Sequence, residues 1–513
     1  MIMHAIKHFG AIFFVYLSLL PSNIFSLIFL HAMDLPHPFL ELPKQDRALL
    51  RDLILLNYPP FDWRKGQNKP DPDPIYDVVI IGAGMAGLTV GAALFKEGIF
   101  HIKLFDQNAP GMEGPWMTYA RMKTLRSNKD IMGPAVGIPH LTFHAWFEAL
   151  FGAEAWKQLV RIPNVLWMDY LNWYRQVMQL PVENSCILTN MIPMQEGFEL
   201  EFQQLGQGQP LIVKARKVVL ATGRAGFGGP GIPDFIKDLP RSVYAHTMDS
   251  INFEALRERR IGIIGVGASS FDAAAVALEI GAKNVDLLMR RSCLPGVNKF
   301  ASLPYKGFSH GYFKLSDEKR WEFMCEAFQA GIPPPVEALK RVEGFTNFRI
   351  LPNTMISQIH FDGSEVLVKT NRGTYAYDFL ILGTGFHVDG YQQPELRHVI
   401  DHIALWKDRL PAEMINKHPK MGSFPYLGPS FEFLPKEPGS ASYLKNLYCY
   451  NYGATLSHGL LSSDIPAISI GATRLAQGIA ADFFVQESEW YLECLKNYQT
   501  KDFEQTDFQL IFH

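Results

Sequence analysis

The most constraining feature of this chain is a strand, glycine turn, helix and strand that occur in this order twice. Residues 76–106 read YDVVIIGAGMAGLTVGAALFKEGIFHIKLFD, and residues 260–292 read RIGIIGVGASSFDAAAVALEIGAKNVDLLMRRS. In each stretch an apolar strand runs into closely spaced glycines and then into a helix. This order predicts parallel sheets covered by helices, so we expect an α/β protein with two Rossmann-like dinucleotide-binding domains.

The first unit carries the spacing Gly-x-Gly-x-x-Gly at Gly82, Gly84 and Gly87. The first glycine permits the tight turn, the second lets a pyrophosphate approach the backbone, and the third lets helix and strand pack closely. The amino end of the following helix supplies free N–H groups and a partial positive charge. Asp106 ends the second strand, where a carboxylate can accept hydrogen bonds from an adenosine ribose. The unit therefore predicts a dinucleotide with a free ribose, and FAD fits.

The second unit has Gly265 and Gly267, and a small residue, Ser270, replaces the third glycine. The position that corresponds to Asp106 is Met289, and Arg290 and Arg291 follow it. Guanidinium groups bind a 2′-phosphate that a carboxylate would repel. This change of sign predicts NADPH at the second unit. The alternative is that both arginines are only a solvated strand end.

The order of the motifs predicts how the domains share the chain. We expect an NADPH domain inserted into an FAD-binding domain that is split in sequence. The expected segments are 1–75 as an apolar N-terminal segment and linker, 76–250 as the first portion of the FAD-binding domain, 251–372 as the NADPH-binding domain, and 373–513 as the second portion of the FAD-binding domain with the C-terminal region.

Composition excludes several classes of function. The net charge of −3 indicates no nucleic-acid-binding surface. The five cysteines include no Cys-x-x-Cys pair, which argues against a dithiol redox centre and against a zinc site, so no metal is expected. Scattered reduced thiols favour a reducing compartment, and we expect a cytoplasmic protein.

The apolar residues 9–32 leave three interpretations open. Pro21, Ser22 and Asn23 interrupt the segment, so it is too short on either side for an ordinary spanning helix of about 20 residues. It is a membrane-associated segment, a cleaved signal peptide, or an extension upstream of a true start at Met33.

Two further motifs carry a resemblance to a known family. The sequence LATG ends at Gly223 and the sequence LGTG ends at Gly385. With the two glycine units, they resemble the class B flavin-dependent monooxygenases, a group of flavin-containing, Baeyer–Villiger and N-hydroxylating enzymes. In this resemblance Trp116 matches a tryptophan of the loop against the flavin, and His246 matches the histidine of the family fingerprint.

The chain departs from that fingerprint, because Pro240 and Ser242 stand where the Baeyer–Villiger and flavin-containing subgroups have phenylalanine and glycine. It also has Glu113 in place of the first glycine of the flavin loop. These departures indicate another subgroup. Two more cofactor contacts are candidates: Arg126, in the basic loop after Trp116, and Asp464, which opens the last helix and otherwise serves as its N-cap.

The resemblance implies an FAD-dependent NADPH monooxygenase. One atom of O2 would pass, by way of a hydroperoxyflavin, into a small organic substrate that the sequence does not name. It identifies no catalytic side chain and no oligomeric state. Two alternatives remain open: an FAD-dependent NADPH oxidase or reductase, and a non-catalytic flavin-binding sensor or membrane-associated adaptor.

Overall fold

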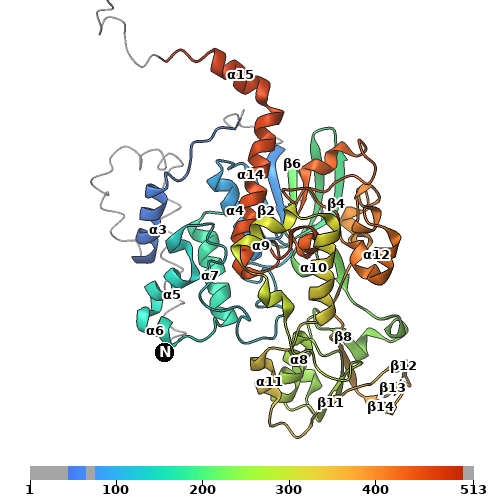
Figure 1. Cartoon of the computed structure of the whole chain (residues 1–513). Coiled ribbons are helices and arrows are strands. Elements are labelled where there is room, and N and C mark those ends of the chain that lie inside the picture. Colours follow the sequence, from blue (N-terminus) through green and yellow to red (C-terminus); the bar gives the residue numbers. More distant parts are fainter. Residues whose placement is uncertain (1–43, 65–74, 501–513) are drawn as a thin grey trace, which may run out of the picture.

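The computed structural model describes residues 44–64 and 75–500 (Figure 1). The predictions for residues 9–32 and for a start at Met33 lie outside the described residues. Within the two described ranges, no helix combines the length and the apolar character needed to cross a membrane.

The first sheet is built around the first glycine unit. Its strand order is β3-β2-β1-β6-β5-β4, and β17 also pairs with β6. Its strands are β1 (Ile75–Ile81), β2 (Ile102–Phe105), β3 (Val182–Glu183), β4 (Cys186–Met194), β5 (Gly197–Gln204), β6 (Leu211–Leu220) and β17 (Leu447–Cys449). The strands β3, β2, β1, β6 and β17 run parallel, and β4 and β5 continue from β6 as antiparallel strands. Because β17 comes from the C-terminal region, the domain built on this sheet is formed from two separate segments of the chain.

Helices pack on this sheet, and the apolar side chains between helices and strands form one hydrophobic core. The helix α4 (Met85–Lys96) follows the first glycine turn, and the long helix α14 (Ile468–Gln486) lies against it. The other helices of this half are α3 (Lys44–Leu55), α5 (Phe143–Phe151), α6 (Ala153–Gln158), α7 (Asn164–Val177), α13 (Thr455–His458) and α15 (Ser488–Lys496). The residues between Gly87 and Leu94 of α4 are all buried, which explains why its sequence is apolar all round.

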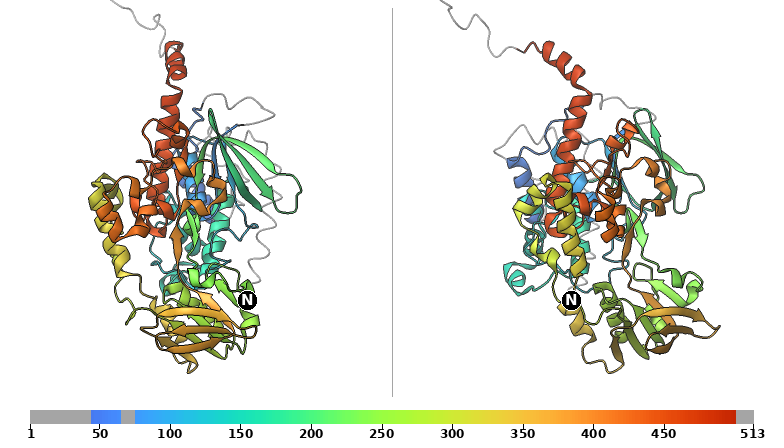
Figure 2. Two further views of the ribbon diagram at one scale, coloured as in Figure 1. Left: turned by 90° about the vertical axis from the view of Figure 1, so that its right-hand side faces the viewer. Right: turned by 45° about the vertical axis from the view of Figure 1, so that its right-hand side comes forward.

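The second sheet is built around the second glycine unit. Its order is β11-β10-β9-β15-β8, and all its neighbouring strands pair in parallel. These strands are β8 (Tyr244–His246), β9 (Arg260–Ile264), β10 (Asn284–Leu288), β11 (Phe348–Leu351) and β15 (Phe379–Leu382). Helices α8 (Ala268–Glu279) and α11 (Val336–Val342) belong to this half, which forms the lower lobe in Figures 1 and 2. The edge strand β8 and its neighbour β15 both lie outside the expected segment 251–372.

Three other elements complete this region. An antiparallel meander of β12 (Ile356–Phe361), β13 (Val366–Thr370) and β14 (Gly373–Tyr377) packs on the second sheet. The short strands β7 (Gly228–Pro230) and β16 (Phe386–Val388) pair antiparallel where the chain crosses between the halves.

One helical segment crosses from the second unit back to the first. The helices α9 (Lys306–Gly311) and α10 (Asp317–Ala330) follow β10, yet Figure 1 shows them beside α14, above the second sheet. They share an apolar cluster with the C-terminal region, where Phe308, Trp321 and Met324 meet Trp406 and Leu456. The small helix α12 (Ala412–Lys417) lies in the same region of the chain. This segment therefore lies on the half that holds the first glycine unit.

Candidate functional site: two glycine loops and the residues that join them

The first glycine loop lies at the carboxyl end of β1. Gly82 has a φ of +97°, and a Cβ there would lie 2.5 Å from the carbonyl oxygen of Ala221. A Cβ on Gly87 would lie 1.9 Å from the carbonyl oxygen of Gly82, so the fold itself requires both glycines. Gly84 differs, because it is the N-cap of α4 with a φ of −68°, and a Cβ there would come no nearer than 3.4 Å, to Gly114 Cα. Its missing side chain leaves backbone open for a ligand at the helix end.

Asp106 follows β2 directly, beside the glycine loop. Its carboxylate accepts hydrogen bonds of 2.8 Å from the backbone N–H groups of Ala83 and Asn108. Burial raises the pKa of Asp106, and these two bonds oppose the rise. A carboxylate has more lone pairs than these bonds use, so the group fits the ribose role predicted for it.

The loop that carries Trp116 lies against the first glycine turn. Asn164 donates a hydrogen bond of 3.1 Å to the Trp116 carbonyl, and the ring meets Trp167 edge to face at 6.2 Å. The Trp116 side chain is buried, and its Nε1–H has no partner among residues 44–64 and 75–500. Buried polar groups nearly always have a partner, so this N–H is one that a bound ligand would satisfy. The unpartnered N–H of Trp116 and the open backbone at Gly84 are both features that fit a bound FAD.

Glu113 has a structural explanation. Its buried carboxylate accepts hydrogen bonds from Arg175 at 2.9 Å, from Asn184 at 2.7 Å and from the Gly111 N–H at 2.8 Å. The residue that replaces the expected glycine thus anchors the loop to α7 and to the start of β4.

The C-terminal region supplies a residue that sequence patterns did not indicate. The Asn451 amide donates to the Leu220 carbonyl at 3.2 Å and to Thr222 Oγ1 at 3.1 Å. It also accepts the Gly453 N–H at 2.8 Å. Asn451 therefore fixes the LATG segment beside the first glycine loop. Its position just after β17, a short apolar strand, is the one local signal that the sequence offers.

Asp464 does not open the last helix directly. It precedes the single turn Ile465–Ala467 and makes no side-chain capping bond, and α14 begins only at Ile468. Asp464 is thus the N-cap residue of the turn that leads into α14, although its side chain makes no capping hydrogen bond. Burial raises the pKa of Asp464 to about 6.

The second glycine loop repeats the geometry of the first. Gly265 has a φ of +110°, and a Cβ there would lie 2.4 Å from the carbonyl oxygen of Gly383. This contact corresponds to the one that a Cβ on Gly82 would make with the Ala221 carbonyl oxygen. Gly267 is the N-cap of α8, and no described atom lies within 4 Å of a Cβ placed on it. Ser270 is buried, and a Cβ on Gly383 would lie 1.9 Å from its Oγ. A serine fits the third position because residue 383 is a glycine.

The two units also pair in the same register. Ile81 is opposite Phe105 in the first sheet, as Ile264 is opposite Leu288 in the second. Met289 therefore occupies the position of Asp106, as the sequence predicts.

The two arginines follow this position on the surface. Arg290 is exposed and makes no hydrogen bond or ion pair among the described residues. Arg291 is also exposed and donates a weak bond of 3.4 Å to the Ala330 carbonyl. Arg290 thus offers a free cation at the predicted place, and Arg291 is only lightly engaged.

The basic loop after Trp116 bridges the two units. Arg121 donates to the carbonyl oxygens of Thr247 and Asp249, at 2.7 Å for the latter. Arg126 pairs at 3.0 Å with Asp272, on the helix that follows the second glycine loop. Arg126, predicted to contact a cofactor, therefore has a described partner in the protein.

Two other cations strengthen this bridge. Lys123 pairs with Glu279 at 3.1 Å, and Arg341 donates to the Arg121 carbonyl at 2.9 Å. Arg341 also pairs with Glu279 at 3.0 Å. The Trp116 loop is therefore fixed to α8 and α11.

His246 lies where the chain crosses between the units. Its Nδ1 accepts the Met248 N–H at 3.1 Å, and its Nε2 has no partner among the described residues. Burial lowers the pKa of His246, which favours the neutral ring. Gly223 and Gly385 have φ values of +72° and +78°, and no described atom lies within 4 Å of a Cβ on either. A ligand could therefore approach the backbone closely at both motif glycines.

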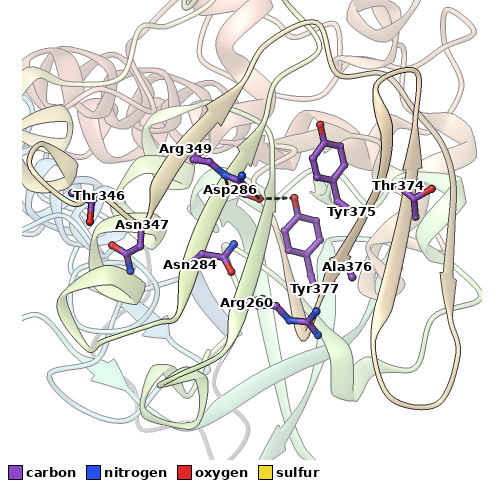
Figure 3. A pocket seen from close by; sticks show the side chains of 10 residues that line it. All are labelled: Arg260, Asn284, Asp286, Thr346, Asn347, Arg349, Thr374, Tyr375, Ala376 and Tyr377. Atoms are coloured by element: carbon purple, nitrogen blue, oxygen red, sulfur yellow. Dashed lines mark hydrogen bonds and ion pairs between the residues drawn. The ribbon is translucent and has the colours of Figure 1, made fainter.

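A separate pocket lies at the end of the second sheet that is opposite the glycine loop. Figure 3 shows Arg349 and Tyr377 pointing at Asp286, at 2.7 Å and 3.0 Å from its Oδ2. These residues come from the amino ends of their strands or from the meander, whereas the glycine loop follows the carboxyl end of β9. Ligands of parallel sheets bind at the carboxyl ends, so this pocket is not the nucleotide site.

Comparisons with known proteins agree with the geometry. A family model described as FAD-NAD(P)-binding matches residues 79–225, and one described as L-lysine 6-monooxygenase/L-ornithine 5-monooxygenase matches residues 156–327. Among solved structures, the ornithine hydroxylase of Pseudomonas aeruginosa has a TM-score of 0.63 at 14% identity and covers 80% of this chain and 99% of its own. The cadaverine monooxygenase of Erwinia amylovora has a TM-score of 0.59 at 13% identity and covers 80% of this chain and 95% of its own. These likenesses confirm the predicted fold.

A curated relative is much more similar in sequence. The FAD-dependent urate hydroxylase of Xanthomonas campestris is 36% identical over 465 residues, which are 90% of this chain and 98% of the relative. The resemblance to the flavin-dependent monooxygenases is thereby confirmed. The chain is an FAD- and NADPH-dependent monooxygenase, and it belongs to the family of the FAD-dependent urate hydroxylase.

Proposed function

We propose that this monooxygenase hydroxylates urate. The observation that carries the proposal is the 36% identity to the urate hydroxylase over 98% of that protein's length. The similar structures named for amine substrates reach only 13–17% identity, so they support the fold and not the substrate. The departures from the Baeyer–Villiger and flavin-containing fingerprints support a substrate outside those subgroups.

The residues of the first unit would bind and orient FAD. Gly84 and the amino end of α4 would receive the pyrophosphate, and Asp106 would accept the ribose hydroxyls. Trp116, with its unpartnered N–H, and Gly223 would line the flavin region of the site. Bound FAD would pass two electrons from NADPH to O2, so that one oxygen atom enters the substrate and the other leaves as water.

The residues of the second unit would bind NADPH. Gly267 and the amino end of α8 would receive its pyrophosphate, while Gly265 and Ser270 keep the turn close to β15. Arg290 and Arg291 would bind the 2′-phosphate. Arg126 would act indirectly, by holding the loop between both nucleotides, and Gly385 would line the open space between them.

The strand pairing supports a revised division of the chain. We place the NADPH unit at 244–382, because β8 and β15 belong to its sheet, and the FAD unit on both sides of it. The α9–α10 segment is an extension of the NADPH unit that packs on the FAD unit. All five cysteines are free, which supports the proposed reducing, cytoplasmic location.

The test is substrate-dependent turnover of the purified, FAD-loaded protein. NADPH oxidation, O2 uptake and urate loss are measured together, with ornithine, lysine and cadaverine as comparison substrates. We expect urate to accelerate NADPH oxidation at least tenfold over the substrate-free rate, with one urate consumed per NADPH. Acceleration by an amine but not by urate would overturn the proposal. Rapid NADPH oxidation with no substrate consumed would favour the oxidase alternative.

A further inference from the structure

Arg224 is an exposed arginine that has no acidic partner. It follows Gly223 at the end of the LATG motif, on the single turn Gly223–Ala225. Its guanidinium forms no hydrogen bond and no ion pair with any residue in 44–64 or 75–500. Other arginines of the site do have partners, since Arg121 donates to two carbonyls and Arg126 pairs with Asp272. Arg224 therefore keeps its full donor capacity for a ligand.

Two aromatic rings fix the place of this guanidinium. Its central carbon lies 4.3 Å from the ring centre of Tyr452 and 5.8 Å from that of Phe386. The rings come from distant regions of the chain, since Tyr452 follows β17 and Phe386 opens β16. Packing on a ring uses the flat face of a guanidinium and leaves the N–H groups in its plane free. Arg224 thus presents an oriented fork of donors that suits a planar anion.

The neighbours of Arg224 place it beside the flavin site. Two residues earlier, Thr222 is fixed by Asn451, and Ala221 lies against the first glycine turn. On the other side, Phe386 directly follows Gly385. A Cβ on Gly223 or Gly385 would meet no described atom within 4 Å, so a ligand could approach the backbone next to Arg224 and next to Phe386.

From this placement we propose that Arg224 binds the negative charge of the substrate and selects flat heterocyclic anions. The proposal rests on the proposed function, since urate is a planar purine derivative that carries a negative charge at neutral pH. The structurally similar hydroxylases named for ornithine and cadaverine act on amines. An unpaired guanidinium at the substrate site repels an ammonium group, so Arg224 excludes such amines as well as attracting anions.

The NADPH pyrophosphate is the other anion that Arg224 could bind. Kinetic measurements distinguish these two ligands. If Arg224 binds the substrate, its loss weakens the binding of urate alone, whereas if it binds the pyrophosphate, its loss weakens the binding of NADPH with or without substrate. Arg224→Ala, Arg224→Gln and Arg224→Lys are compared with wild type in FAD-loaded protein. Arg257→Ala is the matched control, an exposed arginine whose described partner is the nearby Glu254.

For Arg224→Ala and Arg224→Gln, we expect the KM for urate to rise ten- to hundredfold. The Kd for NADP+ and the rate of flavin reduction without substrate should stay within twofold of wild type. Arg224→Lys should recover some of the urate affinity, because it restores the charge without the planar fork. A tenfold weaker NADP+ affinity with an unchanged KM for urate would overturn the proposal, as would equal effects of Arg257→Ala.

A second measurement keeps this test independent of urate. The flavin spectrum is titrated with planar anions (urate, xanthine, orotate, nicotinate), with neutral caffeine and with cationic ornithine. If urate fails but another planar anion perturbs the wild-type spectrum and loses affinity in Arg224→Ala, the proposed function is wrong and the Arg224 site stands. If wild type shows no preference for anions, or if Arg224→Ala keeps it, the Arg224 site is wrong.

Discussion

Arg126 and Asp272 are 146 residues apart in sequence, and they join the two nucleotide-binding units through an ion pair of 3.0 Å. The Asp272 side chain is only 6% exposed, so the pair is better shielded than an ordinary surface pair. Arg126 lies on the Trp116 loop, and Asp272 lies on the helix that starts at the second glycine loop. The pair therefore holds the Trp116 loop against the first helix of the second unit.

We expect Arg126→Ala to slow flavin reduction by NADPH roughly five- to tenfold, with the FAD content unchanged. The loss corresponds to about 1 kcal/mol, which is the upper end for a partly exposed pair. Stopped-flow reduction under anaerobic conditions measures it. Lys123→Ala is the control. The pair of Lys123 with Glu279 is more exposed, so its loss should change the rate of flavin reduction less than twofold. Equal rates in both variants would show that the Arg126 pair does not position the units.

The two N-cap glycines separate cofactor binding from folding. A methyl group on Gly84 or Gly267 meets no close protein atom, and both have φ values that alanine adopts. We expect Gly84→Ala to lower FAD affinity at least tenfold, because the methyl lies where the pyrophosphate approaches. Gly267→Ala should raise the KM for NADPH by a similar factor and leave FAD bound. Flavin absorbance per protein and steady-state kinetics measure these effects.

The controls for these glycines lie in the same chain. Gly208→Ala, at a surface glycine with open space around it, should change neither cofactor. Gly87→Ala should fail to fold, because its Cβ would lie 1.9 Å from a carbonyl oxygen. A Gly84→Ala protein that purifies fully loaded with FAD would contradict the assignment of the first loop.

The repeated unit could be predicted in detail because its determinants are local. Glycine spacing, apolar strands and the residue after each second strand are all close in sequence, so the match of Met289 to Asp106 is correct. The contacts between units could not be predicted this way. Asp272 is one of two acids on α8, and nothing near it in sequence indicates Arg126 as its partner.

The same reasoning explains two features that the sequence did not reveal. Asn451 becomes relevant only when β17 pairs with β6 and brings it to the LATG segment. The α9–α10 segment follows β10 in sequence, but its apolar residues find their partners around Trp406, in a region of the chain with no recognisable motif. Arg224 did carry a local signal, since it directly follows Gly223, the glycine that ends the LATG motif.

The second unit has two arginines directly after the position where the first unit has an acid, and this change of charge predicts a preference for NADPH over NADH. Losing a charge-assisted bond to the 2′-phosphate costs about 1.5–3 kcal/mol, or roughly ten- to hundredfold in affinity. We expect Arg290→Ala to show most of this loss, because Arg291 also contacts Ala330. The ratio of flavin-reduction efficiencies with NADPH and NADH measures it, with Arg257→Ala as a surface control. A wild-type preference for NADH, or an unchanged ratio in a variant that carries both Arg290→Ala and Arg291→Ala, would show that both arginines are only surface charges.

The raised pKa of Asp464 makes stability depend on pH in a defined direction. Its pKa is about 6 in the folded protein, above the ordinary value of 3.8, because burial disfavours the carboxylate. Between about pH 4 and pH 6 the folded state therefore binds more protons than the unfolded state. Stability falls as pH rises through this window, and the loss is complete above the folded pKa.

Asp464→Asn removes this loss, since asparagine stays neutral. We expect the variant to gain about 1 kcal/mol over wild type between pH 4.5 and pH 7, which is less than the full pKa shift implies because the site retains some solvent contact. The melting temperatures of both proteins, measured without added nucleotides at each pH, give this gain as a few degrees. Asp238→Asn, at an exposed aspartate, is the control and should follow wild type at both values. A variant that is less stable than wild type at pH 7 would show that the Asp464 carboxylate has a stabilising partner when charged, and the direction argued from burial would be wrong.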